Sequence, residues 1–153
     1  ANGEHTIEVL REHQESWSTA VEEILRMESP VLLSARTAMV DTEVAGRRIR
    51  QGDTVLIYMA AANRDPAVFT DPQRFDVERA NAGRHLSFSG GRHFCLGAAL
   101  ARAEGEVGLG AFFRRFPEVR AAGAGVRRDT RVLRGWSSLP VTLGRAADRT
   151  LTG

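Results

Sequence analysis

The chain has 153 residues, of which 42% are hydrophobic and 26% are charged, and these values are typical of one globular domain. Its longest apolar run, residues 55–62, is far too short to cross a bilayer, and no amino-terminal stretch has the residue order of a signal peptide. A membrane partner is therefore not expected. A single cysteine, Cys95, excludes an intrachain disulfide and a multi-cysteine zinc site, which favours a reducing cytoplasm.

Charge is unevenly distributed along the chain. All basic residues are arginine; residues 1–30 carry two of them against seven glutamates, whereas residues 81–153 carry twelve against five acidic residues. A basic half indicates an acidic protein partner or a nucleic acid, and its alternative is a solvated surface with no partner at all.

The first thirty residues are predicted to form two helices. Apolar residues repeat at helical spacing on both sides of a break at residues 13–16. Ser18 or Thr19 can cap the second helix, and Pro30 ends it, because the residue before a proline resists helical geometry.

The next segment changes to short β-branched runs separated by turns. We expect a small antiparallel sheet and then one helical turn, with strands at residues 37–40, 43–44, 47–49 and 54–58 and the turn at residues 59–63. Residues 64–94 carry turn signals without a regular period. So long an irregular stretch within a compact domain is usually functional.

Helical spacing returns at residues 96–116. One stripe of this predicted helix contains Leu100, Ala103, Val107 and Ala111. Strand-like runs at residues 132–133 and 139–143 predict a C-terminal hairpin, and residues 144–153 are expected to be a frayed tail.

Cys95 lies between a glycine loop and the start of this helix. The free N–H groups and the dipole at a helix start stabilise a thiolate, and Arg92 and His93 add positive charge. Such a thiolate can attack an electrophile or bind a soft metal centre, whereas a lone cysteine is otherwise an inert apolar residue. A cysteine hydrolase has less support, because His93 is only two residues away and no orienting acid is adjacent.

The residues around Cys95 form the pattern Phe-x-x-Gly-x-x-x-Cys-x-Gly, which resembles the haem-binding loop of cytochrome P450 monooxygenases of the bacterial soluble type. Further segments match this family in the same chain order: Glu23-Ile24-Leu25-Arg26, residues 62–66, residues 71–75, and Ser29-Pro30-Val31 with Arg36. The resemblance covers about residues 5–143.

The resemblance implies an α+β, mainly α fold that corresponds to the C-terminal portion of the P450 domain. Its expected parts are two N-terminal helices, a small antiparallel sheet, an irregular meander, the cysteine loop, a long helix and a C-terminal hairpin. Residues 1–153 would then be a single partial domain.

The resemblance also implies roles for individual residues. The cofactor would be haem b, iron protoporphyrin IX, bound by Arg36, Phe88, Gly91, His93, Cys95 and Gly97. Cys95 would be the axial thiolate and the metal ligand, Phe88 would shield its sulfur, and Arg36 and His93 would bind the propionates. His85 is an outside candidate near the loop. Glu23, Arg26 and Arg74 would form a buried structural triad.

Substrate and partner contacts follow from the same resemblance. Val31, Leu32, Leu33, Trp136 and Ser137 would line the pocket for a small hydrophobic substrate, although both segments are equally suited to a plain core. An acidic ferredoxin or a flavin-type electron donor would dock on Arg92, Arg102, Arg114 and Arg115.

The family's domain is well over twice as long as this chain, and the helix that carries its oxygen-activating acid–alcohol pair has no match here, so no catalytic residue is assigned. We expect part of a working monooxygenase, completed by a missing N-terminal portion or a complementing chain. The alternatives are a truncated inactive remnant that binds haem or a partner, and a basic scaffold or nucleic-acid-binding module. The last has least support, because the arginines lack interleaved aromatic residues.

Overall fold

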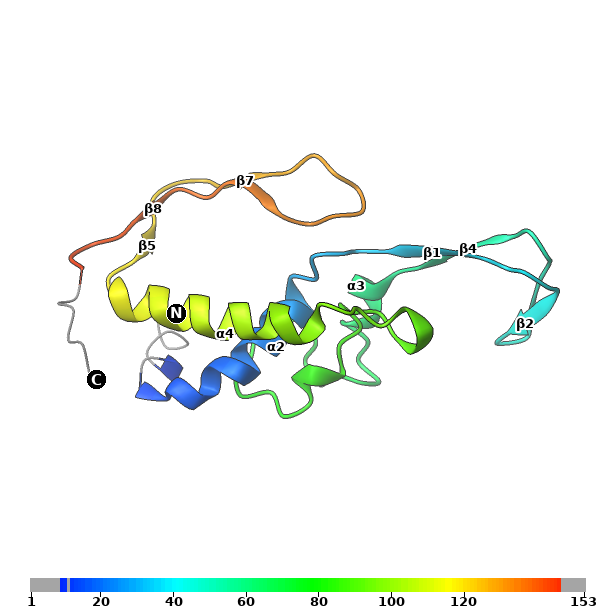
Figure 1. The fold of residues 1–153 in the computed structure, drawn as a ribbon, viewed down its shortest axis with the longest axis horizontal. Coiled ribbons are helices and arrows are strands. Elements are labelled where there is room, and N and C mark those ends of the chain that lie inside the picture. Colours follow the sequence, from blue (N-terminus) through cyan, green and yellow to red (C-terminus); the bar gives the residue numbers. More distant parts are fainter. Residues whose placement is uncertain (1–8, 11, 147–153) are drawn as a thin grey trace.

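Two helices packed side by side form the centre of the structure, a computed structural model that describes residues 9–10 and 12–146 (Figure 1). Helix α2 spans Trp17–Met27 and helix α4 spans Ala98–Arg115. A hairpin arm leaves the end of α2, and a C-terminal ribbon leaves the end of α4. The irregular segment that follows the arm, residues 63–87 and here called the meander, packs beside α2 and leads to the cysteine loop and α4 (Figure 1).

Helix α2 follows a short 3-10 turn, η1 (Gln14–Ser16), and carries its apolar residues on one side. Trp17, Ala20 and Val21 are buried on that side. The Trp17 ring stacks on Phe113 of α4 with the ring centroids 5.5 Å apart. Packing against α4 therefore follows the apolar stripe that the sequence predicts for α2.

The predicted caps of α2 are wrong, because the helix begins before both of them. Ser18 and Thr19 lie inside α2, and the Ser18 hydroxyl donates to a carbonyl of η1 at 3.2 Å. The residue at the cap position, Ser16, makes no side-chain capping bond. The predicted end before Pro30 is confirmed, since the helix ends at Met27. The helix predicted ahead of α2 falls largely outside the described residues.

Four short strands form the hairpin arm. The antiparallel pairs are β1 (Ser34–Thr37) with β4 (Thr54–Ile57), and β2 (Thr42–Val44) with β3 (Arg47–Ile49). A turn at Gly46, whose φ of 74° suits glycine, joins β2 to β3 as predicted. The strand predicted at residues 37–40 instead lies at 34–37. Its partner β4 follows a turn at Gly52 with φ of 90°, and pairing with β4 therefore stops at Thr37.

The remaining elements are short. They are α3 (Met59–Ala62), η2 (Ala82–Arg84), η3 (Gly91–His93), β5 (Arg120–Ala121), β6 (Val126–Arg127), β7 (Trp136–Ser138) and β8 (Val141–Thr142). The irregular stretch predicted over residues 64–94 is confirmed apart from its two 3-10 turns. In the C-terminal ribbon β5 pairs with β8 and β6 pairs with β7, both antiparallel. The predicted tail from residue 147 onward lies outside the described residues.

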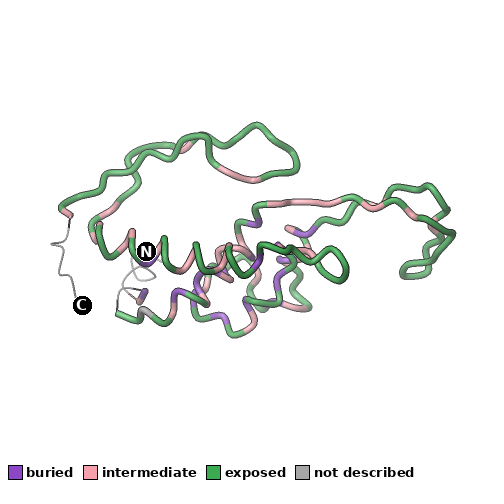
Figure 2. Tube along the Cα trace, in the orientation of Figure 1, coloured by how far each residue is buried: buried purple, intermediate pink, exposed green. Residues whose placement is uncertain are grey.

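The apolar core of the described chain is small. Leu10, Trp17, Ala20 and Val77 form its buried cluster, and Phe113 packs against it. Figure 2 shows that buried positions gather around α2 and the adjacent meander, whereas the arm and the C-terminal ribbon are mostly exposed. No described helix combines the length and the apolar character needed to cross a membrane.

Helix α4 packs on α2 through a side other than the stripe read from the sequence. Leu100 and Val107 of that stripe are 63% and 69% exposed. Glycines face α2 instead: a Cβ added at Gly105 would lie 3.0 Å from Cγ1 of Val21. The interface therefore depends on close backbone approach, which the apolar periodicity of α4 does not reveal.

Gly105→Ala and Gly108→Ala form a matched pair that tests this close approach. A Cβ at Gly108 meets nothing within 4 Å, so its alanine variant should raise the unfolding free energy by up to about 1 kcal/mol through helix propensity. At Gly105 the same propensity gain is opposed by the collision with Val21. We expect a smaller gain or a loss in urea unfolding of the chain. Equal gains at both positions would contradict close packing.

Candidate functional site

A loop closed by backbone hydrogen bonds holds Cys95. The Cys95 amide donates to the carbonyl of Phe88 at 2.9 Å, and the Phe94 amide donates to Gly91 at 3.1 Å. Ser89 and Gly91 both have positive φ, 63° and 59°, and the position after Ser89 is also glycine. Adjacent glycines let the chain turn sharply here, so the loop brings its cysteine back beside Phe88.

The Cys95 thiol is free and exposed just ahead of α4. In the described part of the chain, the amides of Leu96 and Gly97 donate to no acceptor, as is usual for the first N–H groups of a helix. A Cβ added at Gly97 would lie 3.9 Å from Cys95 Sγ, so the start of α4, where a helix end attracts negative charge, passes close to the sulfur. The site is therefore suited to a soft metal ion or an electrophile.

Exposed apolar side chains flank this thiol. Phe94 is 51% exposed, Leu96 is fully exposed and Leu100, in the first turn of α4, is 63% exposed. A cysteine sulfur surrounded by uncovered apolar surface fits a large, flat, apolar metal complex better than a bare hydrated ion. Within residues 9–10 and 12–146, no three His, Cys, Asp or Glu side chains converge as a metal site, so Cys95 would act as a single protein ligand.

The other predicted cofactor residues lie on separate elements. Arg36, on β1, is half-buried and donates to Ser34 Oγ at 2.7 Å and to the Ala35 carbonyl at 2.8 Å. His93 is exposed in η3. No contact in the described chain joins Arg36 to His93 or to Cys95, so their roles toward haem propionates stay predictions.

The predicted buried ion pair is present. Glu23 and Arg26 are fully buried on α2, and Nε and Nη2 of Arg26 donate to the two carboxylate oxygens of Glu23 at 2.6 and 2.8 Å. The other Arg26 donors reach meander carbonyls, those of Asn63, Pro72 and Arg74, at 2.8, 2.9 and 3.2 Å. All five guanidinium N–H groups are thus used.

The third member of this cluster is Arg79 and not Arg74, which corrects the sequence prediction. Arg79 Nε lies 3.2 Å from Glu23 Oε1, and its remaining donors bind the carbonyls of Thr70, Asp71 and Arg74 at 2.6, 3.3 and 3.1 Å. The side chain of Arg74 is exposed, and only its carbonyl joins the cluster. The meander puts Arg79 against Glu23 because the Asp76 amide also donates to Glu23, at 2.9 Å.

A second buried polar cluster, missed in the sequence, holds the start of the cysteine loop. Asn63 donates through Nδ2 to Ser29 Oγ and Ser87 Oγ at 2.7 and 2.8 Å, and its Oδ1 accepts the Leu86 amide at 2.6 Å. Ser87 also donates to the Leu25 carbonyl at 2.6 Å. In the sequence Asn63 is only part of a segment that matches the family, and no residue spacing indicates its partners.

His85, Glu22 and Arg102 form a third polar group between α2 and α4. Arg102 binds Glu22 through Nε and Nη2, the latter at 3.1 Å, and His85 Nε2 lies 3.0 Å from Glu22 Oε2 without the alignment of a hydrogen bond. Burial alone would raise the pKa of Glu22, but the hydrogen bonds and charge of Arg102 outweigh it and lower that pKa. Burial lowers the pKa of His85 more than Glu22 raises it.

The arginines predicted to bind a redox partner do not form one compact patch. Arg92 is exposed on the cysteine loop, while the Arg102 side chain is paired with Glu22 and only 30% exposed. Arg114 and Arg115 lie in the last turn of α4, which at 1.5 Å per residue is about 24 Å from its start. Two separate basic regions therefore exist along α4.

The first segment predicted to line a substrate pocket, residues 31–33, is joined by backbone bonds to residues 132–134, the run just ahead of the second predicted segment, residues 136–137. The Leu32 amide donates to Val132 and the Arg134 amide donates to Pro30, both at 2.8 Å, and Val31 bridges to Leu133. Val31, Leu32 and Leu33 are half-buried.

The Trp136 ring carries the Arg127 guanidinium 3.6 Å above its centroid, and the Ser137 hydroxyl donates to the Val126 carbonyl at 3.0 Å. These contacts order both segments, and their role toward a substrate stays a prediction.

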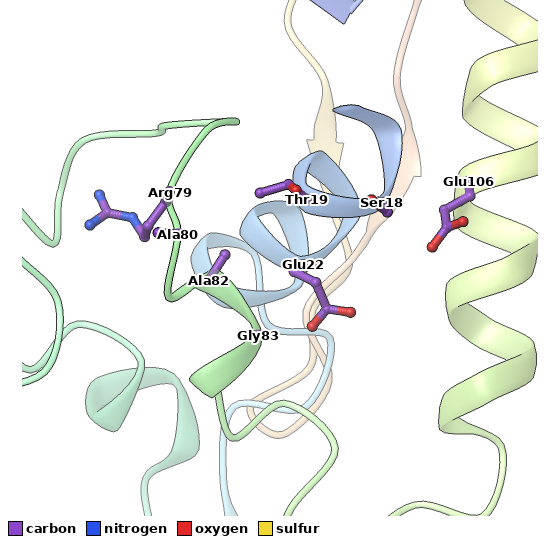
Figure 3. Close-up of a pocket in the computed structure, with 8 residues that line it drawn as sticks. All are labelled: Ser18, Thr19, Glu22, Arg79, Ala80, Ala82, Gly83 and Glu106. Atoms are coloured by element: carbon purple, nitrogen blue, oxygen red, sulfur yellow. The ribbon is translucent and has the colours of Figure 1, made fainter. Parts of the chain in front are cut away.

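One cleft of about 220 Å3 lies between α2, the meander and α4. Figure 3 shows that it is lined by Ser18, Thr19, Glu22, Arg79, Ala80, Ala82, Gly83 and Glu106. None of the predicted haem or substrate residues lines it. It is thus separate from the exposed thiol of Cys95.

The chain is similar to known proteins over most of its length. Residues 13–123 match the family model described as Cytochrome P450. "Putative cytochrome P450 140" of Mycobacterium tuberculosis is 75% identical over 137 residues, 90% of this chain and 31% of that protein. "6-deoxyerythronolide B hydroxylase" of Saccharopolyspora erythraea is 46% identical over 138 residues, 88% of this chain and 34% of that protein.

A solved structure of P450BioI in complex with a fatty-acid-ligated acyl carrier protein superposes with a TM-score of 0.88, at 41% identity over 91% of this chain and 36% of that chain. The fold expected from the sequence, a portion of the P450 fold, is confirmed. The chain spans about a third of the length of the curated relatives it matches.

Arg79→Ala and Arg74→Ala test the corrected triad. Removing Arg79 leaves part of the buried charge of Glu23 unpaired and takes a donor from the carbonyls of Thr70, Asp71 and Arg74, so we expect the unfolding free energy to fall by about 3–5 kcal/mol. Arg74→Ala, at an exposed side chain, should change it by less than about 0.5 kcal/mol. Urea unfolding of the two variants checks this. Comparable losses would restore Arg74 to the triad.

His85→Gln tests the buried histidine. Because the pKa of His85 is lowered from 6.5, the unfolded chain binds this proton at higher pH than the folded chain. The free energy of unfolding is therefore unaffected by this group above about pH 6.5, where His85 is neutral in both states. It decreases as the pH falls from 6.5 toward the folded-state pKa of His85. The variant should lack this decrease.

Glu22 contributes to the free energy of unfolding in a different pH range of the same experiment. The pKa of Glu22 is lowered from 4.5, so its contribution decreases only below about pH 4.5 and should remain in the His85→Gln variant. Urea unfolding as a function of pH distinguishes the two windows. A wild-type profile that matches the variant down to pH 4.5 would contradict the assignment.

Proposed function

The chain belongs to the cytochrome P450 family, and we propose that it is the haem-ligating part of a monooxygenase that oxidises a small hydrophobic substrate with O2. Members of this family bind iron protoporphyrin IX through a thiolate. The observation that carries the proposal is the exposed Cys95 thiol, just ahead of α4 and between uncovered apolar side chains. The name of the relative from Saccharopolyspora, a hydroxylase, supports the same class of reaction.

Bound haem supplies oxygen activation, and thiolate ligation favours O–O cleavage. The residues of this chain supply position and electrostatics. Cys95 would hold the haem iron through its thiolate, the Leu96 and Gly97 amides would lower the cost of that negative charge, and Phe88 would pack against the ligand loop. Arg36 and His93 are proposed to hold the propionates, since a guanidinium and an imidazole N–H suit carboxylates.

Electrons would come from an acidic donor protein of the ferredoxin or flavin type. Arg92 on the cysteine loop and Arg114 and Arg115 at the far end of α4 provide positive charge for it. An acidic surface would be attracted to these arginines with a strength that decreases as salt is added. The proposed substrate-lining segments are residues 31–33 and residues 136–137. Residues 30–32 hydrogen-bond to residues 132–134, and residues 136–137 follow that run along the chain.

Cys95→Ala tests the ligand. In the full-length protein that contains this chain, the reduced and CO-bound form should show the Soret band typical of thiolate ligation, and the variant should lose that band completely. Ala122→Ser, at an exposed position in the C-terminal ribbon, is the control that should retain it. A thiolate band that survives in Cys95→Ala would overturn the proposal.

The same spectrum separates a working enzyme from an inactive remnant. A thiolate band together with oxygen-dependent consumption of NADPH, when an electron-donor protein is present, supports the monooxygenase. The band without any such consumption favours the inactive haem-binding form.

A further inference from the structure

The aromatic ring of Phe88 is coupled directly to the cysteine loop. The Phe88 carbonyl accepts the Cys95 amide at 2.9 Å, so the two residues are held together through the backbone. The half-buried ring has aromatic neighbours on two elements: its centroid lies 5.6 Å from that of His85 and 6.4 Å from that of Phe94. A shift of the Phe88 ring would therefore also move the loop that carries the Cys95 thiol.

A cation lies over this ring. The Arg102 guanidinium carbon is 4.7 Å from the Phe88 centroid, within the range of a cation–π interaction. Arg102 follows Ala98, the first residue of α4, by four residues, which is about one helical turn, so it lies near the start of the helix that follows the cysteine loop.

Glu22 fixes the orientation of that cation. Nε and Nη2 of Arg102 donate to the two carboxylate oxygens of Glu22, which makes the pair bidentate. A bidentate pair fixes the plane of the guanidinium as well as its position, and a lysine could not reproduce this geometry. The Glu22 side chain is only 17% exposed, and its neighbour on α2, Glu23, is fully buried in the cluster with Arg26. The anchor thus belongs to the most rigidly bonded part of the chain.

We propose that Arg102 and Glu22 are positioning residues for the Cys95 ligand. The ion pair holds the guanidinium over the Phe88 ring, and the ring in turn keeps the Phe88 carbonyl against the Cys95 amide. A path of direct contacts then runs from α2 through Glu22, Arg102 and Phe88 to Cys95. The inference rests on the proposed function, because it assigns the pair to the haem ligand.

The assignment also distinguishes Arg102 from the other arginines near the loop. Arg92 and Arg84 are exposed, whereas Arg102 uses its charge within the chain. Burial opposes the charged form of Arg102, yet the Glu22 hydrogen bond is the larger effect and raises its pKa. Arg102 is therefore a cation whose charge is paired within the chain rather than offered to a partner.

Amide hydrogen exchange in the full-length, haem-loaded protein and in its haem-depleted form tests the proposal. The variants are Arg102→Gln, Arg102→Lys and Glu22→Gln, and Arg84→Gln is the matched control at an exposed arginine. We expect the Cys95 amide to exchange on the order of threefold to tenfold faster in all three variants, the range of one cation–π contact, and to be unchanged in the control. Because lysine keeps the charge and loses the planar fork, Arg102→Lys should not rescue the effect.

A double variant, Glu22→Gln with Arg102→Gln, shows whether the two residues act as one unit. Exchange of the Cys95 amide should be little faster than in Arg102→Gln alone, because the hydrogen bonds of Glu22 go to Arg102, whereas His85 lies beside Glu22 without the alignment of a hydrogen bond. The reduced CO-bound spectrum gives a second reading: the fraction of haem in the thiolate-type band should fall in the three single variants and stay constant in Arg84→Gln.

The outcomes separate this inference from the proposed function. If Cys95→Ala removes the thiolate band while Arg102→Gln leaves both the exchange of the Cys95 amide and the spectrum unchanged, the positioning role is wrong and the ligand assignment stands. Full rescue by Arg102→Lys would also overturn the positioning role, since charge alone would then suffice. If Cys95→Ala keeps the thiolate band, the proposed function itself fails.

Discussion

The buried carboxylate of Glu23 is the constraint on which the rest of this structure depends. A charge with no exposure is very costly unless every lone pair is engaged, and here the two oxygens accept bonds from Arg26, from Arg79 and from the Asp76 amide. Those donors come from α2 and from the meander. Satisfying one side chain of a helix thus requires the irregular chain to adopt one shape beside it.

The arginines extend that requirement to the backbone. Two guanidinium groups bring two positive charges to one carboxylate, and the excess is stabilised by carbonyl dipoles of the meander. Segments without strands or helices leave carbonyls without partners, and a buried carbonyl needs one. Arg26 and Arg79 supply these partners, so that their guanidinium groups take the place of the backbone N–H donors of a neighbouring strand. This explains how about thirty residues of irregular chain lead to a well-defined cysteine loop.

The sequence predicts local features well and long-range partners poorly. Glu23 and Arg26 are three residues apart on a helix, a spacing that places them on the same side. Arg79 could not be chosen over Arg74 because both lie in irregular chain, and only the turn at Asp76 decides which one reaches Glu23. The side of α4 that packs was missed for a related reason. Its contact with α2 depends on Gly105, whereas the apolar pattern draws attention to Leu100 and Val107, which are exposed.

In this chain polar contacts and apolar burial have different roles. The buried apolar cluster is small, and many large apolar side chains, Leu96 among them, are exposed. Yet polar contacts hold the cysteine loop. Asn63 hydrogen-bonds Ser87 and the Leu86 amide just before the loop, and the Arg102 guanidinium lies over the ring of Phe88 within it. Such directional bonds fix positions, whereas apolar contacts mainly supply free energy. The position of the cysteine loop therefore does not depend on whether the exposed apolar surface beside Cys95 is covered.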